Sequence, residues 1–263
     1  MDILIISLSS AEGRQNFQRE QLTHYQLEYQ FLNATSTEDI SPADYQQHYH
    51  DWQRPLKKTE VACYYSHRSA WEKVISTNKP MLILEDDVLL SSCITSLLPA
   101  LENRPNTDLI NLENRGRKKF VSKTSKSTVC SSNILRLYQD RTGAAAYILW
   151  PSGAKKLLEC EQKSGIALAD AHITACHLLR AYQIEPAAAI QLDHCGHYLM
   201  KNPSNQALAK SSVSTQYNHK GGWRFWLKRI YHQVSLGWRQ LLLLKTSERR
   251  YIKIRSKDFY KQT

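Results

Sequence analysis

Short apolar runs of strand length recur along this chain, and segments with helical periodicity separate them. Residues 2–8 (DILIISL), 81–84 (MLIL) and 144–150 (AAAYILW) are such runs. Between the first two lies a helical segment, residues 59–76, whose inner face is predicted to consist of Cys63, His67, Ala70, Trp71 and Val74. Apolar strands that alternate with helices are typical of a mostly parallel sheet with helices on both faces. The sequence therefore predicts an α/β fold.

The same patterns predict the remaining elements. Ser9 and Glu12 have the spacing of a capping box, which indicates a helix from there to about Thr23. Further strands are expected at residues 27–34, 108–113 and 133–138, and further helices at residues 152–159 and 171–182. The Lys/Ser/Thr-rich residues 117–132 are expected to form a mobile surface loop.

Three consecutive carboxylates, Glu85, Asp86 and Asp87, follow the run at residues 81–84. Negative charges at the end of a buried strand are costly unless a cation binds beside them. Ligands of open α/β sheets bind outside the carboxyl ends of the strands, and oxygen ligands favour Mg²⁺ or Mn²⁺. The alternative is an acidic corner exposed to water, and the three acids alone do not decide between the two.

The net charge of +11 is concentrated in the C-terminal part of the chain. Residues 201–263 hold 14 Lys/Arg and 2 Asp/Glu, whereas residues 1–200 hold 21 Lys/Arg and 22 Asp/Glu. We therefore expect a main domain at residues 1–205 and a basic helical extension at residues 206–263. The extension has an apolar stripe at helical spacing, formed by Leu227, Tyr231, Val234, Trp238 and Leu241. Such a helix either packs on the domain or lies in a membrane interface.

Cysteine spacing and hydropathy indicate the compartment. No two of the six cysteines form a C-x-x-C pair, which argues against a zinc site or a disulfide framework and suits a reducing cytoplasm. The N-terminal run is too short for a signal peptide and is interpreted as a first strand. No stretch reaches the roughly 18 uncharged apolar residues of a membrane span.

Several segments resemble, in order and spacing, those of glycosyltransferase family 25, which includes bacterial lipooligosaccharide galactosyltransferases and collagen galactosyltransferases. The most specific part is E-x-x-C-x-x-S-H-x-x-x-W at residues 60–71 followed by E-D-D at residues 85–87. The other matching segments are ISL with Arg14, FLNAT at residues 31–35, RTGAAAYILWPSGAKKLL at residues 141–158 and EPAAAIQLDH at residues 185–194. The chain departs from the family where one arginine follows the first strand and where Ala62 replaces a usual glycine.

The resemblance implies a GT-A-like, Rossmann-type domain that inverts the anomeric carbon of a UDP-sugar, with UDP-galactose as the expected donor. It implies a Mn²⁺ or Mg²⁺ cofactor held by Asp87, with Glu85 as a further ligand or a ribose contact and His194 as a third contact to the metal or to the diphosphate. The implied donor contacts are Ser7, Leu8, Arg14, Ala34, Ser66, His67 and Asp86, and the implied acceptor contacts are Thr142 and Gly143. For His67 a role as a core histidine remains equally open, and Arg14 could instead be a solvated surface arginine.

The implied acceptor is a terminal sugar of a lipooligosaccharide or lipopolysaccharide. The chain is therefore expected in the cytoplasm, bound peripherally to the anionic inner face of the cytoplasmic membrane through its C-terminal extension.

Inversion requires a base that takes the proton of the acceptor hydroxyl. Asp170 matches a family aspartate and is the candidate, while Asp140 and Asp193 are lesser ones. Asp170 also precedes a helical run, where aspartate is a favoured N-cap, so catalysis and capping both remain open.

Two other classes of protein are compatible with parts of the sequence. A metal-dependent phosphohydrolase also clusters acids at a strand end, but a second set of metal ligands is not evident. A nucleic-acid-binding protein would explain the basic charge, but the neutral main domain and the lack of a recognisable motif argue against it.

Overall fold

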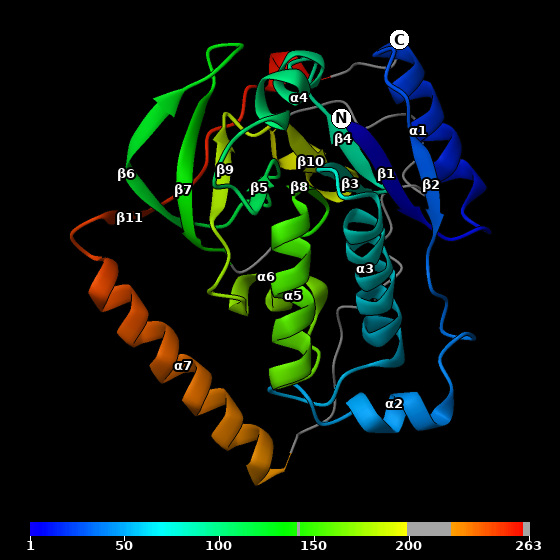
Figure 1. Ribbon diagram of the computed structural model, residues 1–263, viewed down its shortest axis with the longest axis vertical. Helices are drawn as coiled ribbons and strands as arrows, with labels where there is room; N and C mark the ends of the chain where they lie inside the picture. Colours follow the sequence, from blue (N-terminus) through cyan, green and yellow to red (C-terminus); the bar gives the residue numbers. More distant parts are fainter. Residues whose placement is uncertain (141–142, 199–221, 260–263) are drawn as a thin grey trace.

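The computed structural model describes residues 1–140, 143–198 and 222–259, and its centre is a nine-stranded sheet (Figure 1). The strand order is β11-β6-β7-β9-β5-β8-β3-β1-β2. The strands are β1 (Asp2–Ser7), β2 (Gln30–Asn33), β3 (Met81–Glu85), β5 (Leu109–Asn111), β6 (Lys119–Ser127), β7 (Asn133–Gln139), β8 (Ala146–Leu149), β9 (Ala181–Glu185) and β11 (Ser247–Arg250). A small second sheet pairs β4 (Val88–Leu90) with β10 (Ala189–Gln191).

Helices cover both faces of the main sheet. They are α1 (Glu12–His24), α2 (Pro42–His48), α3 (Lys58–Thr77), α4 (Ile94–Glu102), α5 (Pro151–Ser164), α6 (Ala169–Ala175) and α7 (Trp223–Leu243), with 3₁₀ turns η1 (Leu192–Tyr198) and η2 (Ser256–Asp258). In Figure 1, α3 and α5 lie below the sheet and α4 lies above it.

The two layers follow from the alternation of side chains along the strands. Met81 and Ile83 of β3 belong to the hydrophobic core that includes α3 and α5, whereas Leu82 and Leu84 belong to the core that includes α4. Successive side chains of a strand point to opposite faces, so an uninterrupted apolar run is buried on both. The expected α/β class is confirmed.

The sheet is mixed in direction. β3, β1 and β2 run parallel, as do β5 and β9, whereas β8 lies antiparallel between β3 and β5. β7, β6 and β11 continue the sheet with antiparallel pairings. The parallel group at β1, β2 and β3 brings three carboxyl ends to one edge, which is where ligands of such sheets bind.

Three local predictions are wrong. The helix after β1 begins at Glu12, with Ala11 as its N-cap and no side-chain cap, so Ser9 forms no capping box. Instead, Ala11 N donates a hydrogen bond to Leu8 O and closes a turn before the helix. Residues 117–132 are not a loop, because residues 119–127 form β6 between β7 and β11.

The third error concerns residues 171–182, where one helix was expected. α6 ends at Ala175 and β9 begins at Ala181, inserted between β5 and β7. The carboxylate of Asp108 accepts a hydrogen bond from Arg180 N, which holds the chain as it enters this strand. The strand pairing therefore outweighs the helical pattern.

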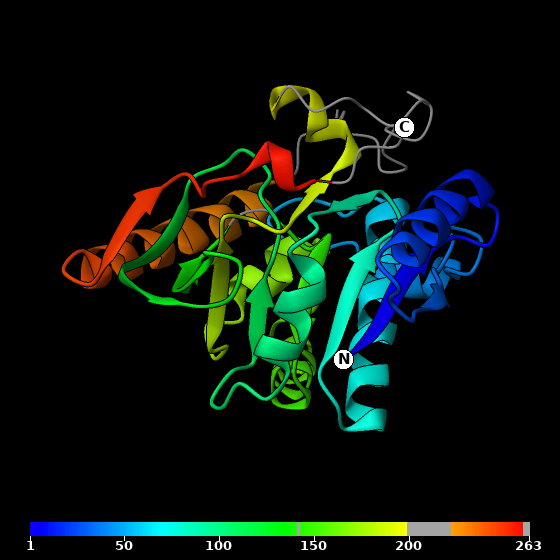
Figure 2. The ribbon, with the colours of Figure 1, turned by 90° about the horizontal axis from the view of Figure 1, so that it is seen from above.

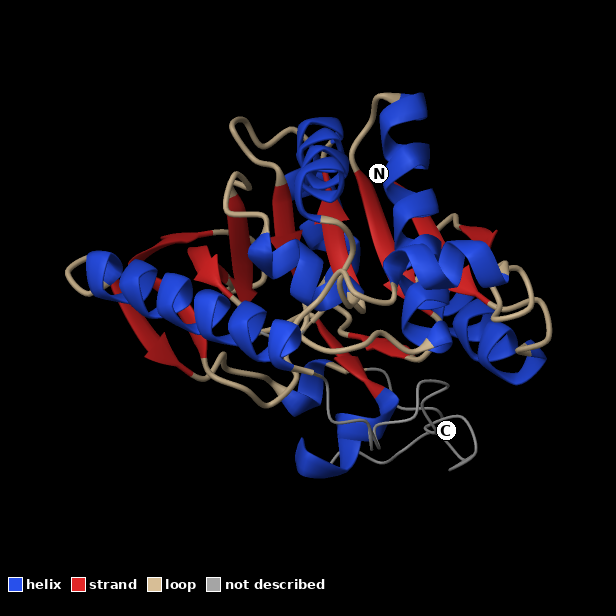
Figure 3. Ribbon diagram, turned by 90° about the horizontal axis from the view of Figure 1, so that it is seen from below, coloured by secondary structure: helices blue, strands red, loops and turns tan. Residues whose placement is uncertain are grey.

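The described part of the C-terminal extension folds back onto the main sheet. β11 pairs with β6 at the sheet edge (Figure 2), and Ile252 and Phe259 are buried against the domain. Before β11, α7 runs along one side of the molecule (Figure 3). Among the described residues, no helix is long and apolar enough to cross a membrane.

Candidate active site

A cavity of ≈ 850 Å³ opens at the carboxyl ends of β1, β2 and β3. Its lining includes nearly all of the residues expected at the donor and metal sites: Ser7, Leu8, Arg14, Ala34, Ser66, His67, Glu85, Asp86 and Asp87. A smaller cavity of ≈ 40 Å³ is lined, like the large one, by Gly143 and Asp170. Residues from separate parts of the sequence therefore form one site.

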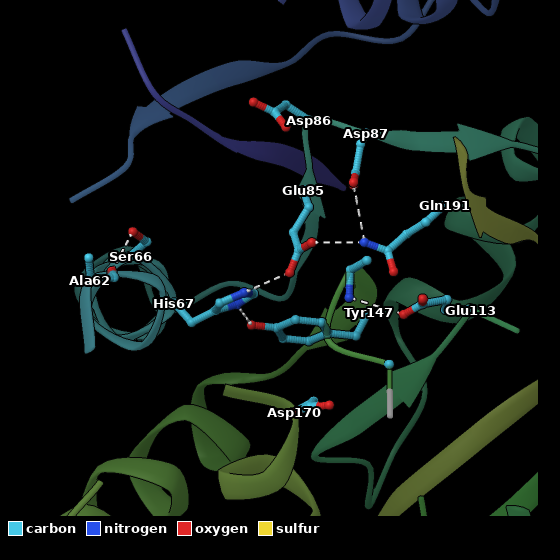
Figure 4. A network of polar contacts seen from close by, with 12 residues as sticks. Ala62, Ser66, His67, Glu85, Asp86, Asp87, Glu113, Tyr147, Asp170 and Gln191 are labelled. Atoms are coloured by element: carbon cyan, nitrogen blue, oxygen red, sulfur yellow. Dashed lines mark hydrogen bonds and ion pairs between the residues drawn. The ribbon is translucent and has the colours of Figure 1, made fainter. Parts of the chain in front are cut away.

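Two of the three consecutive acids converge on one amide. Gln191, the last residue of β10, donates from Nε2 to Glu85 Oε2 (3.1 Å) and to Asp87 Oδ1 (3.2 Å) (Figure 4). Asp87 is fixed by its backbone as well, since its carbonyl accepts a hydrogen bond from Leu192 N (2.9 Å). The amide N–H group thus lies between two carboxylates, where a cation would also be stabilised.

Asp86 turns away from this pair and toward β1. Its Oδ2 accepts a hydrogen bond from Ser7 Oγ (2.8 Å), and its Oδ1 pairs with Arg14 Nη1 (3.0 Å). Burial raises the pKa of Asp86, although Ser7 and Arg14 act in the opposite direction. Ser7, Arg14 and Asp86, all predicted donor contacts, are therefore neighbours. Arg14 is the ion-pair partner of Asp86 rather than a solvated surface arginine.

A chain of buried polar groups holds Glu85. Trp71 Nε1–H donates to Tyr147 Oη (2.9 Å), which lies 3.0 Å from His67 Nδ1, and His67 Nε2 lies 3.2 Å from Glu85 Oε1. These contacts are consistent if Tyr147 donates to Nδ1 and the Nε2–H group of His67 donates to Glu85. His67 is 1% exposed, so it is both a core histidine and a residue of the cavity.

The two converging acids differ in their electrostatics. Burial, followed by the charge of Glu85, raises the pKa of Asp87 to about 7. Burial would also raise the pKa of Glu85, but the hydrogen bond and charge of His67 outweigh it and lower that pKa. A cation bound between the two carboxylates would favour the ionised form of both.

Two sets of side chains could hold a metal ion. Ligand atoms of Cys63, His67 and Glu85 lie within 4.8 Å of one another. Burial raises the pKa of the Cys63 thiol, however, and a neutral thiol is a poor ligand for a hard cation. Among the described residues, Oε1 of Gln191 is a buried acceptor without a hydrogen-bond partner. Oxygen atoms of Glu85 and Asp87 therefore fit Mg²⁺ or Mn²⁺, and Gln191 can add Oε1 as a third ligand once its amide is turned to replace the N–H group.

Asp170 lies in the first turn of α6 rather than at its N-cap, which is Leu168. Its Oδ1 accepts a hydrogen bond from the adjacent Ala171 N (2.7 Å), and no side chain caps the helix. Burial, with a contribution from Asp140, raises the pKa of Asp170 to about 6. Capping therefore does not explain this aspartate, and Figure 4 places it on the far side of Tyr147 from Glu85.

Two other predicted site residues are less well placed. His194 lies in η1 and is not among the residues that line either cavity; its ring contacts that of His197. Thr142 lies outside the described residues, whereas its neighbour Gly143 lines both cavities. The metal role of His194 and the acceptor role of Thr142 stay predictions.

Residues at the end of β5 and in the loop beyond it complete the site, and sequence reasoning missed them. Glu113 is fully buried and accepts a hydrogen bond from Ala145 N (3.1 Å), and burial raises its pKa to about 8. Arg115 and Arg117 line the large cavity, and Arg115 pairs with Asp193. Glu113 could have been found, since it ends the strand expected at residues 108–113, although β5 itself ends at Asn111. Arg115 and Arg117 could not have been found, because the path of the loop between β5 and β6 brings them to the cavity and the sequence does not show that path.

Comparisons with known proteins match one family model and two glycosyltransferases. A family model described as glycosyltransferase family 25 (LPS biosynthesis protein) matches residues 1–173. A Haemophilus influenzae protein named as a glycosyltransferase is 26% identical over 159 residues, 59% of this chain and 56% of its own length. Procollagen galactosyltransferase 1-A of Xenopus laevis is 25% identical over 177 residues, 61% of this chain and 28% of its own length. The chain thus spans about half or less of these relatives.

Solved structures share parts of the backbone arrangement at low identity. A glycosyltransferase involved in glycosylation of the major capsid of PBCV-1 has a TM-score of 0.39 at 9% identity and covers 72% of this chain and 91% of its own. The inositol-1-phosphate CTP transferase from T. maritima has a TM-score of 0.42 at 11% identity, with 72% and 88% covered.

Proposed function

The chain belongs to glycosyltransferase family 25, and from this premise we propose that it transfers galactose from UDP-galactose, with inversion, to a lipid-linked oligosaccharide. The observation that carries the proposal is the cavity at the ends of β1, β2 and β3, with the Glu85–Asp87–Gln191 group on one side and Asp170 on another. Membership in a family described by lipopolysaccharide biosynthesis supports a saccharide acceptor. The collagen galactosyltransferase relative supports galactose as the sugar.

Glu85, Asp87 and Gln191 would hold Mn²⁺ or Mg²⁺. When bound, such an ion supplies a Lewis acid that stabilises the negative charge developing on the diphosphate leaving group. Arg115 and Arg117 line the same cavity. We assign them to binding the diphosphate as well, because one guanidinium group can donate two parallel hydrogen bonds to phosphate oxygens. The ends of β1 and β2, at Ser7 and Ala34, would contact the nucleoside.

Asp170 acts as the base in this scheme. The acceptor oxygen attacks the anomeric carbon of the sugar, the bond from that carbon to the diphosphate breaks, and the hydroxyl proton passes to the Asp170 carboxylate. Burial suits this role, because a pKa of about 6 leaves the group ionised at neutral pH yet more basic than an exposed aspartate. Gly143 lines both cavities together with Asp170, and the acceptor sugar would contact it there.

The reaction is assigned to the inner face of the cytoplasmic membrane, where a lipid-linked acceptor and a cytoplasmic nucleotide sugar meet. The basic charge of residues 201–263 supports this location, because the lipids of that face are anionic.

The test is release of UDP from a panel of UDP-sugars, with and without a saccharide acceptor, in the presence of Mn²⁺ or a chelator. We expect UDP release to be fastest with UDP-galactose and to be abolished by the chelator. Asp87→Asn should lower turnover by on the order of 10²–10³-fold, whereas the exposed Glu38→Gln should leave it unchanged. Release of inorganic phosphate instead of UDP would favour a phosphohydrolase, and full turnover by folded Asp87→Asn would refute the metal assignment.

A further inference from the structure

α7 turns its broad apolar stripe to solvent. Trp226, Leu227, Val234, Trp238 and Leu241 recur at helical spacing and are 62%, 47%, 66%, 66% and 61% exposed. A helix that packed this stripe on the domain would bury it, because burial of apolar surface is what stabilises such a helix. The structure therefore leaves the apolar face of α7 in contact with water.

The opposite face of α7 is already attached to the domain. Phe225 is 8% exposed and stacks on the ring of His50 at 5.4 Å. Lys228 Nζ donates to the carbonyl oxygen of His50 (2.6 Å), and near the other end Gln240 Nε2 donates to Gln139 Oε1 (3.1 Å). The helix thus has a fixed orientation, with one face bound to the protein and the stripe pointing outward.

The charges on and beside α7 indicate what kind of surface the stripe can bind. α7 contains no Asp or Glu, and the exposed cations Arg229, Lys245 and Arg249 lie on it or just beyond it. A second copy of the chain would bring a second strongly cationic extension against the first, and like charges repel. A surface rich in anionic phospholipid matches both the apolar stripe and the cations. Tryptophan favours the lipid–water interface, and cations favour anionic headgroups.

The position of α7 relative to the site gives this contact a purpose. Arg239 of α7 lines the smaller cavity together with Asp170 and Gly143. The helix therefore reaches the smaller cavity, which shares Asp170 and Gly143 with the large one. A bilayer at the stripe would lie across the width of α7, about 10–12 Å, from this cavity, and a saccharide carried on a lipid would have to extend past the helix to reach the base.

We propose that α7 lies in the interface of an anionic lipid bilayer, with Trp226, Val234, Trp238 and Leu241 inserted among the lipids and Arg229 and Lys245 at the headgroups. This contact presents lipid-linked acceptors to the Asp170 side of the cavity, a purpose that rests on the proposed function. The binding itself does not depend on it.

The experiment is co-sedimentation of the full chain with vesicles of phosphatidylcholine alone or of phosphatidylcholine and phosphatidylglycerol. The wild type should bind the anionic vesicles and lose binding as salt is added. Val234→Glu/Trp238→Glu should reduce the partition coefficient at least tenfold. Arg229→Gln/Lys245→Gln should reduce it roughly 25-fold at low salt, about fivefold for each cation. Leu178→Glu, a matched change at a residue 54% exposed outside α7, should bind like the wild type.

Far-ultraviolet circular dichroism and UDP release with a soluble acceptor would verify that each variant is folded. Equal binding of wild type and stripe variant, or equal binding to both kinds of vesicle, would overturn the proposal. A dimer that forms in solution without lipid and is lost in the stripe variant would also overturn it, because the stripe would then bind a second copy. Failure of sugar transfer with intact vesicle binding would refute only the proposed reaction.

Discussion

Glu85, Asp87 and Asp170 are carboxylates of one cavity that differ in what compensates their charge. The hydrogen bond and charge of His67 lower the pKa of Glu85, whereas burial raises the pKa of Asp87 to about 7 and that of Asp170 to about 6. Environments that separate the pKa values of neighbouring carboxylates also separate their chemical roles. For Asp87 and Asp170, whose pKa values are close, position separates the roles. Asp87 shares the Gln191 amide with Glu85 and is suited to binding a cation, whereas Asp170 lies on the far side of Tyr147 and is suited to accepting a proton.

Asp170→Asn should lower kcat by about 10²–10⁴-fold with little change in the KM for the donor, because the base acts on the acceptor proton. For the wild type, kcat/KM should rise about tenfold per pH unit up to roughly pH 6 and then level off, as Asp170 loses its proton. The measurement is a pH profile of UDP release, with exposed Asp2→Asn as control. An unchanged profile in folded Asp170→Asn would assign the base to another residue.

The raised pKa of Asp170 also predicts an effect on stability. Burial favours the protonated form, so stability is lost as pH rises from about 3.9, the value in an unfolded chain, through about 6. Asp170→Asn cannot ionise and should be at least as stable as the wild type at pH 8. Urea unfolding at pH 4 and pH 8 measures this, and a variant less stable than wild type at pH 8 would contradict it.

Gly143, a predicted acceptor contact, has a backbone conformation that favours glycine. Its φ is +122°, and a Cβ there would lie 3.1 Å from Asn111 Nδ2 and 3.2 Å from Glu113 Oε2. Gly143→Ala should therefore lower the free energy of unfolding by about 1–3 kcal/mol. Gly237→Ala is the matched control, since no atom lies within 4 Å of its Cβ, and it should stabilise α7 by up to ~1 kcal/mol. Equal stability of the two variants would refute strain at Gly143.

At the scale of elements, the sequence predicted the strands and helices whose own residues show an apolar run or an apolar helical face. β1, α3 and β3 carry continuous apolar runs or a full helical stripe, and the acids that follow β3 identified the cavity. β6 and β9 could not be predicted in this way, because β6 is largely polar and β9 begins inside the helical pattern of residues 171–182. Both depend on partner strands that are distant in sequence.

β11 is held to the sheet by more than its backbone pairing. Arg250 donates from Nη1 and Nη2 to the two carboxylate oxygens of Glu185, a residue 6% exposed at the end of β9. Arg250→Ala should destabilise the protein by about 1–3 kcal/mol and speed amide hydrogen exchange in β11. Arg249→Ala, on the exposed side of the same strand, should cost less than about 1 kcal/mol. Slow exchange in Arg250→Ala would show that the pairing with β6 suffices.

At the scale of the whole molecule, the charge distribution was predictable and the packing of the extension was not. Counting residues places the positive excess beyond residue 200, but the pairing of β11 with β6 and the burial of Phe259 are tertiary facts. The outward orientation of the α7 stripe could not be predicted either. Helical spacing shows which residues share a face, but it does not show what that face contacts. In the site, the position of Gln191 between two acids likewise depends on the pairing of β10 with β4.

A bound cation should stabilise the folded chain as a whole, because the unfolded chain does not bring Glu85, Asp87 and Gln191 together. At a Mn²⁺ concentration of 100 times Kd the gain is about 2.7 kcal/mol, or roughly 5–10 °C in Tm for a chain of this size. Scanning calorimetry with Mn²⁺ and then with a chelator measures the shift. Asp87→Asn should abolish it while keeping its own Tm in the absence of metal at or above that of the wild type. An equal shift in both proteins would place the ion elsewhere.

The pairing of β11 with β6 has a consequence for the order in which the chain can complete its fold. During synthesis, β6 and β7 emerge about 120 residues before β11, an interval of roughly 6 to 24 seconds at 5–20 residues per second. Throughout that interval one edge of β6 presents unpaired N–H and C=O groups, a template on which a neighbouring nascent chain can add a strand. The exposed part of β6 carries Lys123 and Lys126, and lysine on an open edge discourages such pairing. These lysines lie beyond residues 119–122, the part of β6 with which β11 pairs. Charge therefore opposes intermolecular pairing at the far end of β6, whereas residues 119–122 gain their partner only when β11 arrives.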